Sequence, residues 1–434
     1  DAGLKLGHAV RTIGETLSLA RRDLATATSL LSVRCVAGDR QLAGELAAAA
    51  AAQWTNRAKH SLSELADAVD ARHVASGDVA FALEPDLKDG RGGLRGVHAI
   101  EWAAAALDGI EPGIGRRLAP HYDVLLAARV ELHRSTGRNS NLLALQDQDD
   151  VALRLGDSDA DVLMARVAAA ARVIAWESDE VWFDVRRSLE RGRSRRERSP
   201  VELGHGVRLV EGRVQMTPGV APDALAVLRV AAAAASRGTR IHRGTLDALG
   251  EVPDLPEPWP ADARRLFIEI LASGHDAVAV VESLDHAGLW TRLLPEWEPN
   301  RSRPQRNAYH RFTVDRHLLE ATANASALTD RVSRPDLLLL GTLLHDIGKG
   351  YPGDHAVVGR DLARTICTRM GYSPADVEVV ERLVALHLLL PDAATRRDLD
   401  DPVTVHAVTA QVLDLSTLEV LHALTEADSL ATGP

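Results

Sequence analysis

The sequence predicts a mainly α-helical protein. Aromatic residues make up 3% of the 434 residues, 46% are hydrophobic, and most of the hydrophobic ones are alanine, leucine or valine. The low aromatic share and the abundant alanine and leucine favour helices that pack through small and aliphatic side chains, since sheet proteins are enriched in β-branched and aromatic residues. Apolar residues also recur three and four positions apart over most of the chain, which is the period of a helix.

The first 40 residues predict a small α/β remnant. Leu4 to Val10 have the pattern of a short strand, and a helical pattern follows that stops near Gly38. Because the chain starts with Asp1 rather than Met, we expect residues 1–40 to be the end of a domain that begins earlier.

Residues 41–199 predict a domain of several packed helices. Apolar residues keep helical spacing from Leu42 to Phe183, with breaks at the glycine-rich Asp89 to Gly96 and the acidic Asp147 to Asp150. A basic run from Arg186 to Arg198 follows. We interpret it as a solvated helix end and linker rather than as a phosphate-binding patch.

Residues 200–300 predict a hairpin followed by a helical connector. Val207 to Met216 alternate apolar and polar side chains around Glu211-Gly212, which is typical of two short antiparallel strands. Proline-rich breaks at Pro253 to Pro260 and Pro295 to Pro304 punctuate the helices that follow. We place the last domain boundary near residue 300.

Residues 301–434 predict an all-helical domain. The helices expected from apolar periodicity are His310–Ala327, Pro335–Ile347, His355–Met370, Pro374–Leu390 and Val405–Leu430.

Charge, cysteine content and hydropathy exclude several classes of protein. A net charge of −11 argues against binding to nucleic acid, which depends on clustered Lys and Arg. Cys35 and Cys367 are far apart and lack zinc-motif neighbours, so we expect neither disulfides nor a thiolate zinc site, as suits a reducing cytoplasm. No apolar run approaches the roughly 18 to 20 residues of a membrane helix, so we expect no membrane partner.

An adjacent His345-Asp346 pair at the end of an apolar run is the strongest functional signal. Imidazole and carboxylate together suit a divalent cation of the Mg, Mn, Fe or Zn kind. The candidate metal ligands are His317, His345, Asp346, His355, His387 and Asp428. Six ligands are more than one ion usually takes from protein while leaving a position open for water, which favours two ions with Asp346 as the bridge. Taken alone, His387 would be a core histidine and Asp428 an exposed carboxylate. Their joint occurrence in one helical domain supports the metal site, because burying so many ionisable groups without a cation is costly.

Other residues of this domain are candidates for binding a phosphoryl group or for catalysis on it. Lys349, three residues after Asp346, could neutralise charge on phosphoryl oxygens. His355 follows Asp354, which is well placed as a helix cap, so its imidazole would lie where the helix dipole favours anions. His310 is a candidate for substrate contact.

These motifs resemble the HD phosphohydrolase superfamily, and more specifically the bifunctional PII uridylyltransferase/uridylyl-removing enzymes of bacterial nitrogen regulation. The segments that carry the resemblance are Gly7–Thr12, Asp23–Arg34, Glu84–Arg95, Tyr309–His317, Leu344–Gly350, Gly353–His355 and Arg396–Pro402. The resemblance implies that residues 1–40 end a nucleotidyltransferase domain, 41–199 form its associated helical domain, and 301–434 form an HD phosphohydrolase domain.

The resemblance also implies an activity. It is the metal-dependent removal of a nucleotidyl group, UMP or AMP, from a tyrosine of a PII signalling protein. Asp346, Lys349 and His355 would be catalytic, with one or two ions of Mg or Mn. The implied partners are the nucleotidylated PII protein and a nucleotide, UTP/UMP or ATP/AMP.

This sequence departs from the family pattern in three places. The transferase's Gly-Ser loop and metal-binding Asp pair would lie before Asp1, and the glutamine-sensing ACT domains after Pro434. We therefore expect the whole protein to transfer nucleotides as well, but not this segment alone. Gly96 stands where relatives have an acidic residue. This leaves open whether Lys88, Gly93 and Arg95 bind substrate phosphate or belong to a turn between helices.

Two other functions stay open on the sequence. An HD domain could hydrolyse a free nucleotide second messenger, or it could be a non-catalytic regulatory domain, because the fold alone does not determine the substrate.

Overall fold

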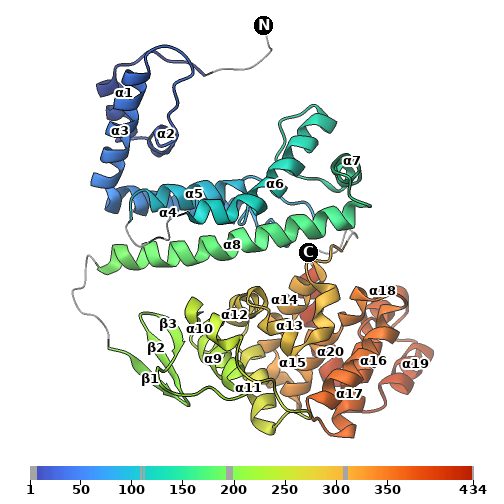
Figure 1. The fold of residues 1–434 in the computed structure, drawn as a ribbon. Coiled ribbons are helices and arrows are strands. Elements are labelled where there is room, and N and C mark those ends of the chain that lie inside the picture. The colour runs from blue at the N-terminus through green and yellow to red at the C-terminus, as the bar shows by residue number, and fades with distance from the viewer. Residues whose placement is uncertain (1–6, 108–109, 111–112, 192–198, 306–310, 433–434) are drawn as a thin grey trace. The chain divides into compact units, whose positions relative to one another are not determined.

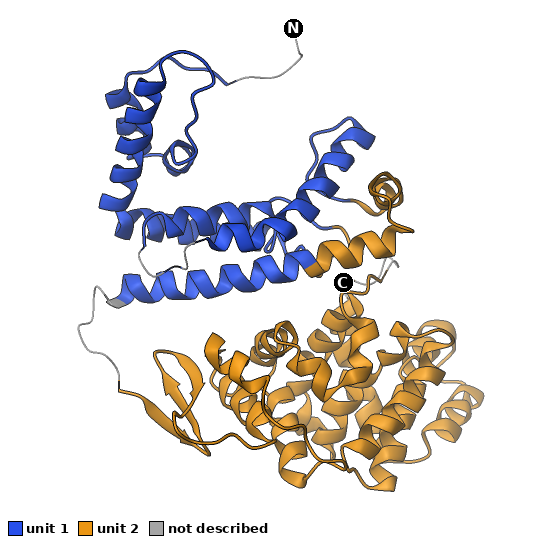
Figure 2. Cartoon of the chain, viewed as in Figure 1, with its two compact units in different colours: residues 1–80, 85–143, 170–195 blue, residues 81–84, 144–169, 196–434 orange. Residues whose placement is uncertain are grey.

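A computed structural model describes residues 7–107, 110, 113–191, 199–305 and 311–432 (Figure 1). It confirms the prediction of a mainly helical protein with one small sheet. The chain divides into two compact units (Figure 2). Unit 1 comprises residues 1–80, 85–143 and 170–195, and unit 2 comprises residues 81–84, 144–169 and 196–434.

Unit 1 is built from helices in its described residues. They are α1 (Ile13–Ala20), α2 (Leu24–Leu30), α3 (Arg40–Asn56), α4 (Ala58–Ser76), α5 (Leu94–Ala104), α6 (Ile114–Thr136) and most of α8 (Ala160–Arg191). Polar side chains start the first three helices. Thr12 and Glu15 form a capping box for α1, and Asp23 and Asp39 accept hydrogen bonds from the first-turn N–H groups of α2 and α3.

The strand predicted for Leu4 to Val10 is not found. Residues 7–10 have no regular secondary structure, and residues 4–6 lie outside the described part of the chain. The described residues of unit 1 contain no strand that could pair with it, and an unpaired strand leaves its backbone hydrogen-bonding groups unsatisfied.

Unit 2 contains the sheet, with strand order β1-β2-β3-β4. The strands are β1 (Val201–Gly204), β2 (Val207–Val210), β3 (Arg213–Met216) and β4 (Arg240–Ile241). The predicted hairpin is confirmed as the antiparallel pair β2 and β3, joined by Glu211 and Gly212, whose φ angles of 54° and 75° fit a tight hairpin turn. Strand β4, which pairs with β3 in parallel, has only two residues and is too short to give a recognisable sequence pattern.

Apart from α8, the described helices of unit 2 up to residue 300 come before, between and after these strands in the sequence. They are α7 (Leu145–Leu155), α9 (Ala226–Ala235), α10 (Arg243–Leu249), α11 (Ala261–Leu271), α12 (His275–His286), α13 (Leu289–Leu293) and the 3₁₀ helix η1 (Pro295–Asn300). Phe267 stacks on Trp290 with ring centroids 5.6 Å apart, and Trp290 meets Trp297 edge-on at 5.8 Å. All three are buried, and this aromatic cluster anchors η1, which contacts the segment carrying Lys349.

The C-terminal part of unit 2 is all-helical. Its elements are α14 (Val314–Ser326), η2 (Thr329–Arg331), α15 (Pro335–Leu344), η3 (Ile347–Gly350), α16 (His355–Arg369), α17 (Pro374–Leu386), α18 (Leu389–Arg396), α19 (Pro402–Val412) and α20 (Leu415–Thr432). Every residue from Leu337 to Leu344 is buried, so α15 is the central helix of this part, and it contacts α14, α17 and α20.

Several predicted helix ends are wrong here. The single helix expected from Val405 to Leu430 is two helices, because Leu413 has a φ of 74° and Asp414 caps the start of α20 through the N–H of Thr417. The helices expected to continue to Ile347 and Leu390 end at Leu344 and Leu386. In each case the histidine that follows belongs to the site described below.

The predicted boundaries near residues 40, 199 and 300 stay predictions. Among the helices that the structure describes, none combines the length and apolar character needed to cross a membrane.

Candidate metal centre

Six side chains from five helical segments meet in unit 2. His317 lies on α14, Asp428 lies on α20, and His355 begins α16. His345 and Asp346 follow α15, and His387 follows α17. Two of the six thus follow the buried α15, and the other four lie on or next to four further helices.

The turn after Asp346 depends on a glycine. A Cβ on Gly348 would lie 2.1 Å from the backbone oxygen of His355, which no side chain tolerates. Because Gly348 has no side chain, η3 can pack directly against the first turn of α16. This close approach brings the Asp346 and His355 side chains together.

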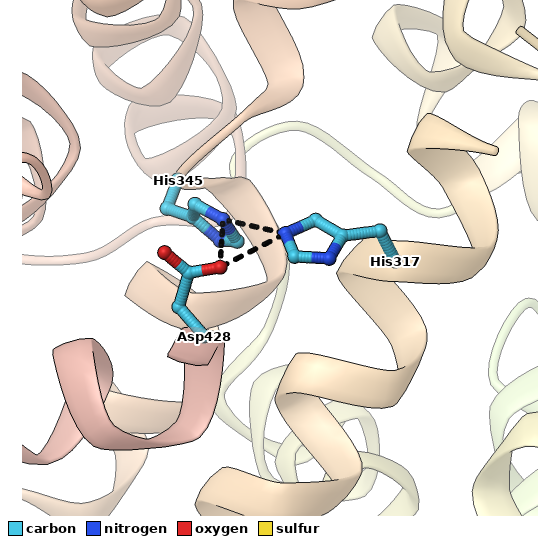
Figure 3. A group of neighbouring side chains, drawn as sticks. All are labelled: His317, His345 and Asp428. Carbon is cyan, nitrogen blue, oxygen red and sulfur yellow. Dashed lines mark hydrogen bonds and ion pairs between the residues drawn. The ribbon is translucent and has the colours of Figure 1, made fainter. Parts of the chain in front are cut away.

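Three of the six side chains form a first group (Figure 3). Nε2 of His317 lies 3.2 Å from Nε2 of His345 and 3.0 Å from Oδ1 of Asp428. Nε2 of His345 lies 3.6 Å from the same Oδ1 atom. Three potential ligand atoms therefore point at one another, close enough to share a cation.

Asp346, His355 and His387 form a second group. Oδ1 of Asp346 lies 3.7 Å from Nε2 of His355 and 3.4 Å from Nε2 of His387. Its other oxygen, Oδ2, lies 3.4 Å from Nε2 of His345 and so faces the first group. The carboxylate of Asp346 thus spans both groups, in the arrangement of a bridging ligand.

Backbone hydrogen bonds orient two of the imidazoles. Nδ1 of His345 lies 2.7 Å from the carbonyl oxygen of Thr342, and Nδ1 of His387 lies 2.7 Å from that of Val384. Because a carbonyl oxygen only accepts, each Nδ1 is the donor, and in a neutral ring Nε2 keeps its lone pair. Metal-ligating histidines commonly have this arrangement.

Two buried atoms of the second group are left without hydrogen bonds. Oδ1 of Asp346 and Nε2 of His387 have no hydrogen-bond partner within the described ranges, although both residues are almost fully buried. Unsatisfied buried polar atoms are costly, and a bound cation would satisfy both. The residues present therefore fit a divalent metal.

Electrostatic coupling keeps the carboxylates charged. Burial alone would raise the pKa of Asp346, but His345, His387 and Lys349 hold it well below its usual range. The pKa of Asp428 is likewise lowered, since His345 and His317 outweigh its burial. Both acids are therefore anionic near neutral pH, as metal ligands must be.

The pKa values of two histidines of the site shift in opposite directions. Burial alone would lower the pKa of His345, yet the carboxylates of Asp346 and Asp428 raise it above its usual value. For His355, burial dominates and lowers the pKa. His355 is therefore largely neutral at neutral pH, with a lone pair for a cation or a substrate proton.

One side of the site is accessible. The side chains of His355, Lys349 and Asp428 are 32%, 22% and 16% exposed, whereas His317, His345, Asp346 and His387 are at most 4% exposed. A substrate must therefore reach the site from the side of His355 and Lys349.

Lys349 reaches back over the site. Its ammonium lies 2.6 Å from Oδ2 of Asp346 and 2.6 Å from Oε1 of Gln305. We did not predict Gln305 from the sequence. The available signal was its position four residues before the Tyr309–His317 motif.

The remaining predicted substrate residues are His310, Lys88, Gly93 and Arg95. His310 lies outside the described residues. Lys88, Gly93 and Arg95 belong to unit 1, where the N–H groups of Gly93 and Arg95 donate to the carbonyl oxygens of Gly90 and Lys88. These N–H groups are thus already used within the loop.

The glycines of that loop have packing roles. Gly92 has a φ of 81°, and a Cβ there would lie 2.4 Å from the carbonyl oxygen of Ala171. A Cβ on Gly93 would lie 2.8 Å from the carbonyl oxygen of Gly90. Of the two interpretations that the sequence left open, the geometry favours a tight turn over a phosphate cradle.

Comparisons with known proteins match both halves of the chain. Residues 314–432 match the HD domain family, and residues 60–182 match the GlnD PII-uridylyltransferase family. Three relatives, each named bifunctional uridylyltransferase/uridylyl-removing enzyme, align with the whole chain. They come from Streptomyces coelicolor at 46% identity, Mycobacterium tuberculosis at 44% and Corynebacterium glutamicum at 36%.

The chain spans only part of these relatives, namely 54%, 55% and 63% of their respective lengths. The resemblance inferred from the motifs is confirmed. The HD match also agrees with the geometry in indicating a site for a divalent metal.

Proposed function

We propose that this chain, a homologue over its whole length of the bifunctional uridylyltransferase/uridylyl-removing enzymes, is a metal-dependent phosphodiesterase that removes a nucleotidyl group from the tyrosine of a PII signalling protein. The observation that carries the proposal is the carboxylate of Asp346 placed between two groups of His and Asp side chains. Because these relatives are named uridylyl-removing enzymes, we propose that the group removed is UMP.

Six residues would hold the metal. His317, His345 and Asp428 would bind one ion, His355 and His387 a second, and Asp346 would bridge the two. Divalent ions at such a site supply Lewis-acid stabilisation of phosphoryl charge and make water acidic enough to serve as a nucleophile near neutral pH. Mg²⁺ and Mn²⁺ are the ions we propose, since the carboxylates of Asp346 and Asp428 suit both ions.

The accessible residues would act on the substrate. The ammonium of Lys349, beside Asp346, is placed to neutralise charge on the phosphoryl oxygens. His355 is the most exposed of the six ligand residues and is largely neutral, so on the substrate side of the site it would accept a proton rather than donate one. The buried His317, His345 and His387 would stay out of reach of the substrate.

The setting follows from the same proposal. The partners would be a uridylylated PII protein and the UMP released from it, in the bacterial cytoplasm. Removal of UMP from a tyrosine phosphodiester needs water alone as second substrate, which fits a site that opens to solvent on one side.

The experiment is an assay of the 434-residue chain on uridylylated PII with Mn²⁺ or Mg²⁺, followed by release of UMP. We expect release that needs the metal and that falls at least about 10³-fold in Asp346→Asn, because the variant loses the charge shared by both groups. Asp330→Asn, an exposed aspartate on η2, is the matched control and should keep full activity.

Two results would contradict the proposal. One is Asp346→Asn protein that is folded and as active as the wild type. The other is faster turnover of a free nucleotide, such as a cyclic dinucleotide, than of uridylylated PII, which would assign the site to a different substrate.

A further inference from the structure

We propose that Gln305 is a positioning residue that holds the ammonium of Lys349 at the phosphate side of Asp346. The inference rests on the proposed function and deepens it, because it assigns a role to a residue that binds neither metal nor substrate. It starts from a chain of hydrogen bonds that runs from Asp346 through Lys349 and Gln305 to the backbone at Phe312.

The amide of Gln305 is fixed at both ends. Its Oε1 accepts a hydrogen bond from Nζ of Lys349 at 2.6 Å, and its Nε2 donates to the carbonyl oxygen of Phe312 at 3.3 Å. The ammonium can only donate and the carbonyl can only accept, so both bonds require this orientation of the amide. Gln305 is 7% exposed, which leaves water little access to it.

The backbone at Phe312, which accepts the hydrogen bond from Gln305, is itself fixed by neighbouring residues. Phe312 forms an antiparallel bridge with Ala82, and the N–H of Thr313 donates to the carbonyl oxygen of Phe81 at 3.1 Å. Phe81 is buried, and the guanidinium of Arg316 lies 4.7 Å from its ring centroid. Phe312 therefore offers Gln305 a fixed carbonyl rather than a mobile loop.

A neutral acceptor suits this place better than a charged one. Lysine has a long, flexible side chain, and holding its ammonium in one position costs conformational entropy. Gln305 restrains the ammonium while leaving its charge available to Asp346 and to a phosphoryl oxygen. A glutamate there would pair with the ammonium and neutralise it.

Gln305 also shares Lys349 with Asp346. Oε1 of Gln305 and Oδ2 of Asp346 both accept from the ammonium and are equally distant from it, at 2.6 Å. Without Gln305, Lys349 should settle more firmly on Asp346 and compete with a cation there. The role of Gln305 therefore depends on Lys349 and should vanish when Lys349 is replaced.

A double-mutant cycle on the 434-residue chain tests this dependence. The variants are Gln305→Met, Lys349→Met and the two combined, with Gln411→Met on α19 as a matched glutamine control. The first readout is the affinity for Mn²⁺ alone, measured by calorimetry. We expect Gln305→Met to weaken Mn²⁺ binding about 3-fold to 10-fold when Lys349 is present and to have no effect in the Lys349→Met background.

The second readout is the hydrolysis of uridylylated PII. We expect Gln305→Met to lower kcat about 10-fold with KM changed less than about 2-fold, and Lys349→Met to lower kcat about 100-fold. The combined variant should be no slower than Lys349→Met. Losses that multiply, an equal loss of Mn²⁺ affinity in both backgrounds, or no loss in either would overturn the proposal, because a merely structural residue acts without Lys349.

The two readouts separate this inference from the proposed function. If the wild type binds Mn²⁺ but releases no UMP, the proposed function fails, and the calorimetric cycle still decides the role of Gln305. If the wild type releases UMP and the cycle shows no coupling, only the role of Gln305 fails.

Discussion

Gly348 packs directly against His355. A Cβ on Gly348 would lie 2.1 Å from the backbone oxygen of His355 and 2.7 Å from the backbone nitrogen of Gly359. Both neighbours are backbone atoms, which cannot swing aside as a side chain can. This contact joins the turn after Asp346 to the start of α16, and so brings together Asp346 and His355 of the second ligand group.

Gly348→Ala should therefore damage both stability and metal binding. We expect the free energy of unfolding to fall by about 2 kcal/mol or more, because η3 and α16 must separate to admit the methyl group. Thermal melting and Mn²⁺ calorimetry measure the two effects. Gly44→Ala on α3, where no atom lies within 4 Å of the new Cβ, should be neutral or slightly stabilising. Unchanged Mn²⁺ binding in Gly348→Ala would contradict the packing role.

Replacing the two acids should have unequal effects on metal stoichiometry. Asp428→Asn removes a ligand of the first group alone, so we expect one of two ions to bind normally. Asp346→Asn removes the residue that spans both groups, so both ions should bind weakly. Metal analysis after dialysis against Mn²⁺ gives the stoichiometry. Equal losses in the two variants would show that Asp346 is no bridge.

Metal binding should stabilise the helical part of unit 2. A ligand at about 100 times its Kd adds about 2.7 kcal/mol to the free energy of unfolding. Calorimetric melting with Mn²⁺ and with a chelator should therefore differ by several degrees in the wild type, and by much less in Asp346→Asn. The same Mn²⁺ shift in both proteins would place the stabilising ion elsewhere.

The stability of unit 1 should depend on His73. Burial, aided by Arg72 and Arg91, lowers the pKa of His73 to about 4, against about 6.5 when unfolded. Below pH 6.5 the unfolded chain binds a proton that the folded chain resists, so stability falls as the pH drops from 6.5 toward 4, and by at most about 3 kcal/mol. This loss is absent above pH 6.5, where neither state holds the proton.

Melting at several pH values tests His73 against a neighbour. His73→Gln should flatten the decline in melting temperature between about pH 6.5 and pH 4. His60→Gln, which replaces an exposed histidine on the same helix, should leave the decline unchanged. An equally steep decline in His73→Gln would assign the acid sensitivity to other groups.

Much of the metal site could be predicted from the sequence because its ligands are chemically distinctive. Histidines and aspartates that interrupt apolar helical patterns, such as His345 and His387, are recognisable without a structure. The bridging position proposed for Asp346 followed from counting ligands, and its two oxygens face different groups. The division of His345 and Asp346 between two groups did not follow, because it depends on the backbone leaving the helix at Asp346, with ψ at 11°.

Other features had little local signal. Leu413 adopts a positive φ that leucine rarely takes, so no glycine marks the end of α19, although Asp414 is of a residue type that starts helices. The turn role of Gly92 depends on Ala171, about 80 residues away. Gln305 acquires its partners only when Phe312 and Lys349 come together in the fold. Such contacts between distant residues are set by packing, which periodicity does not encode.

The most direct measurement is the anomalous scattering of crystals of the chain grown with Mn²⁺. Two peaks about 4 Å apart are expected, one among His317, His345 and Asp428 and the other between His355 and His387, with Asp346 touching both. No peak at these six side chains in Mn²⁺-saturated crystals would contradict the two-ion site and the hydrolytic function built on it.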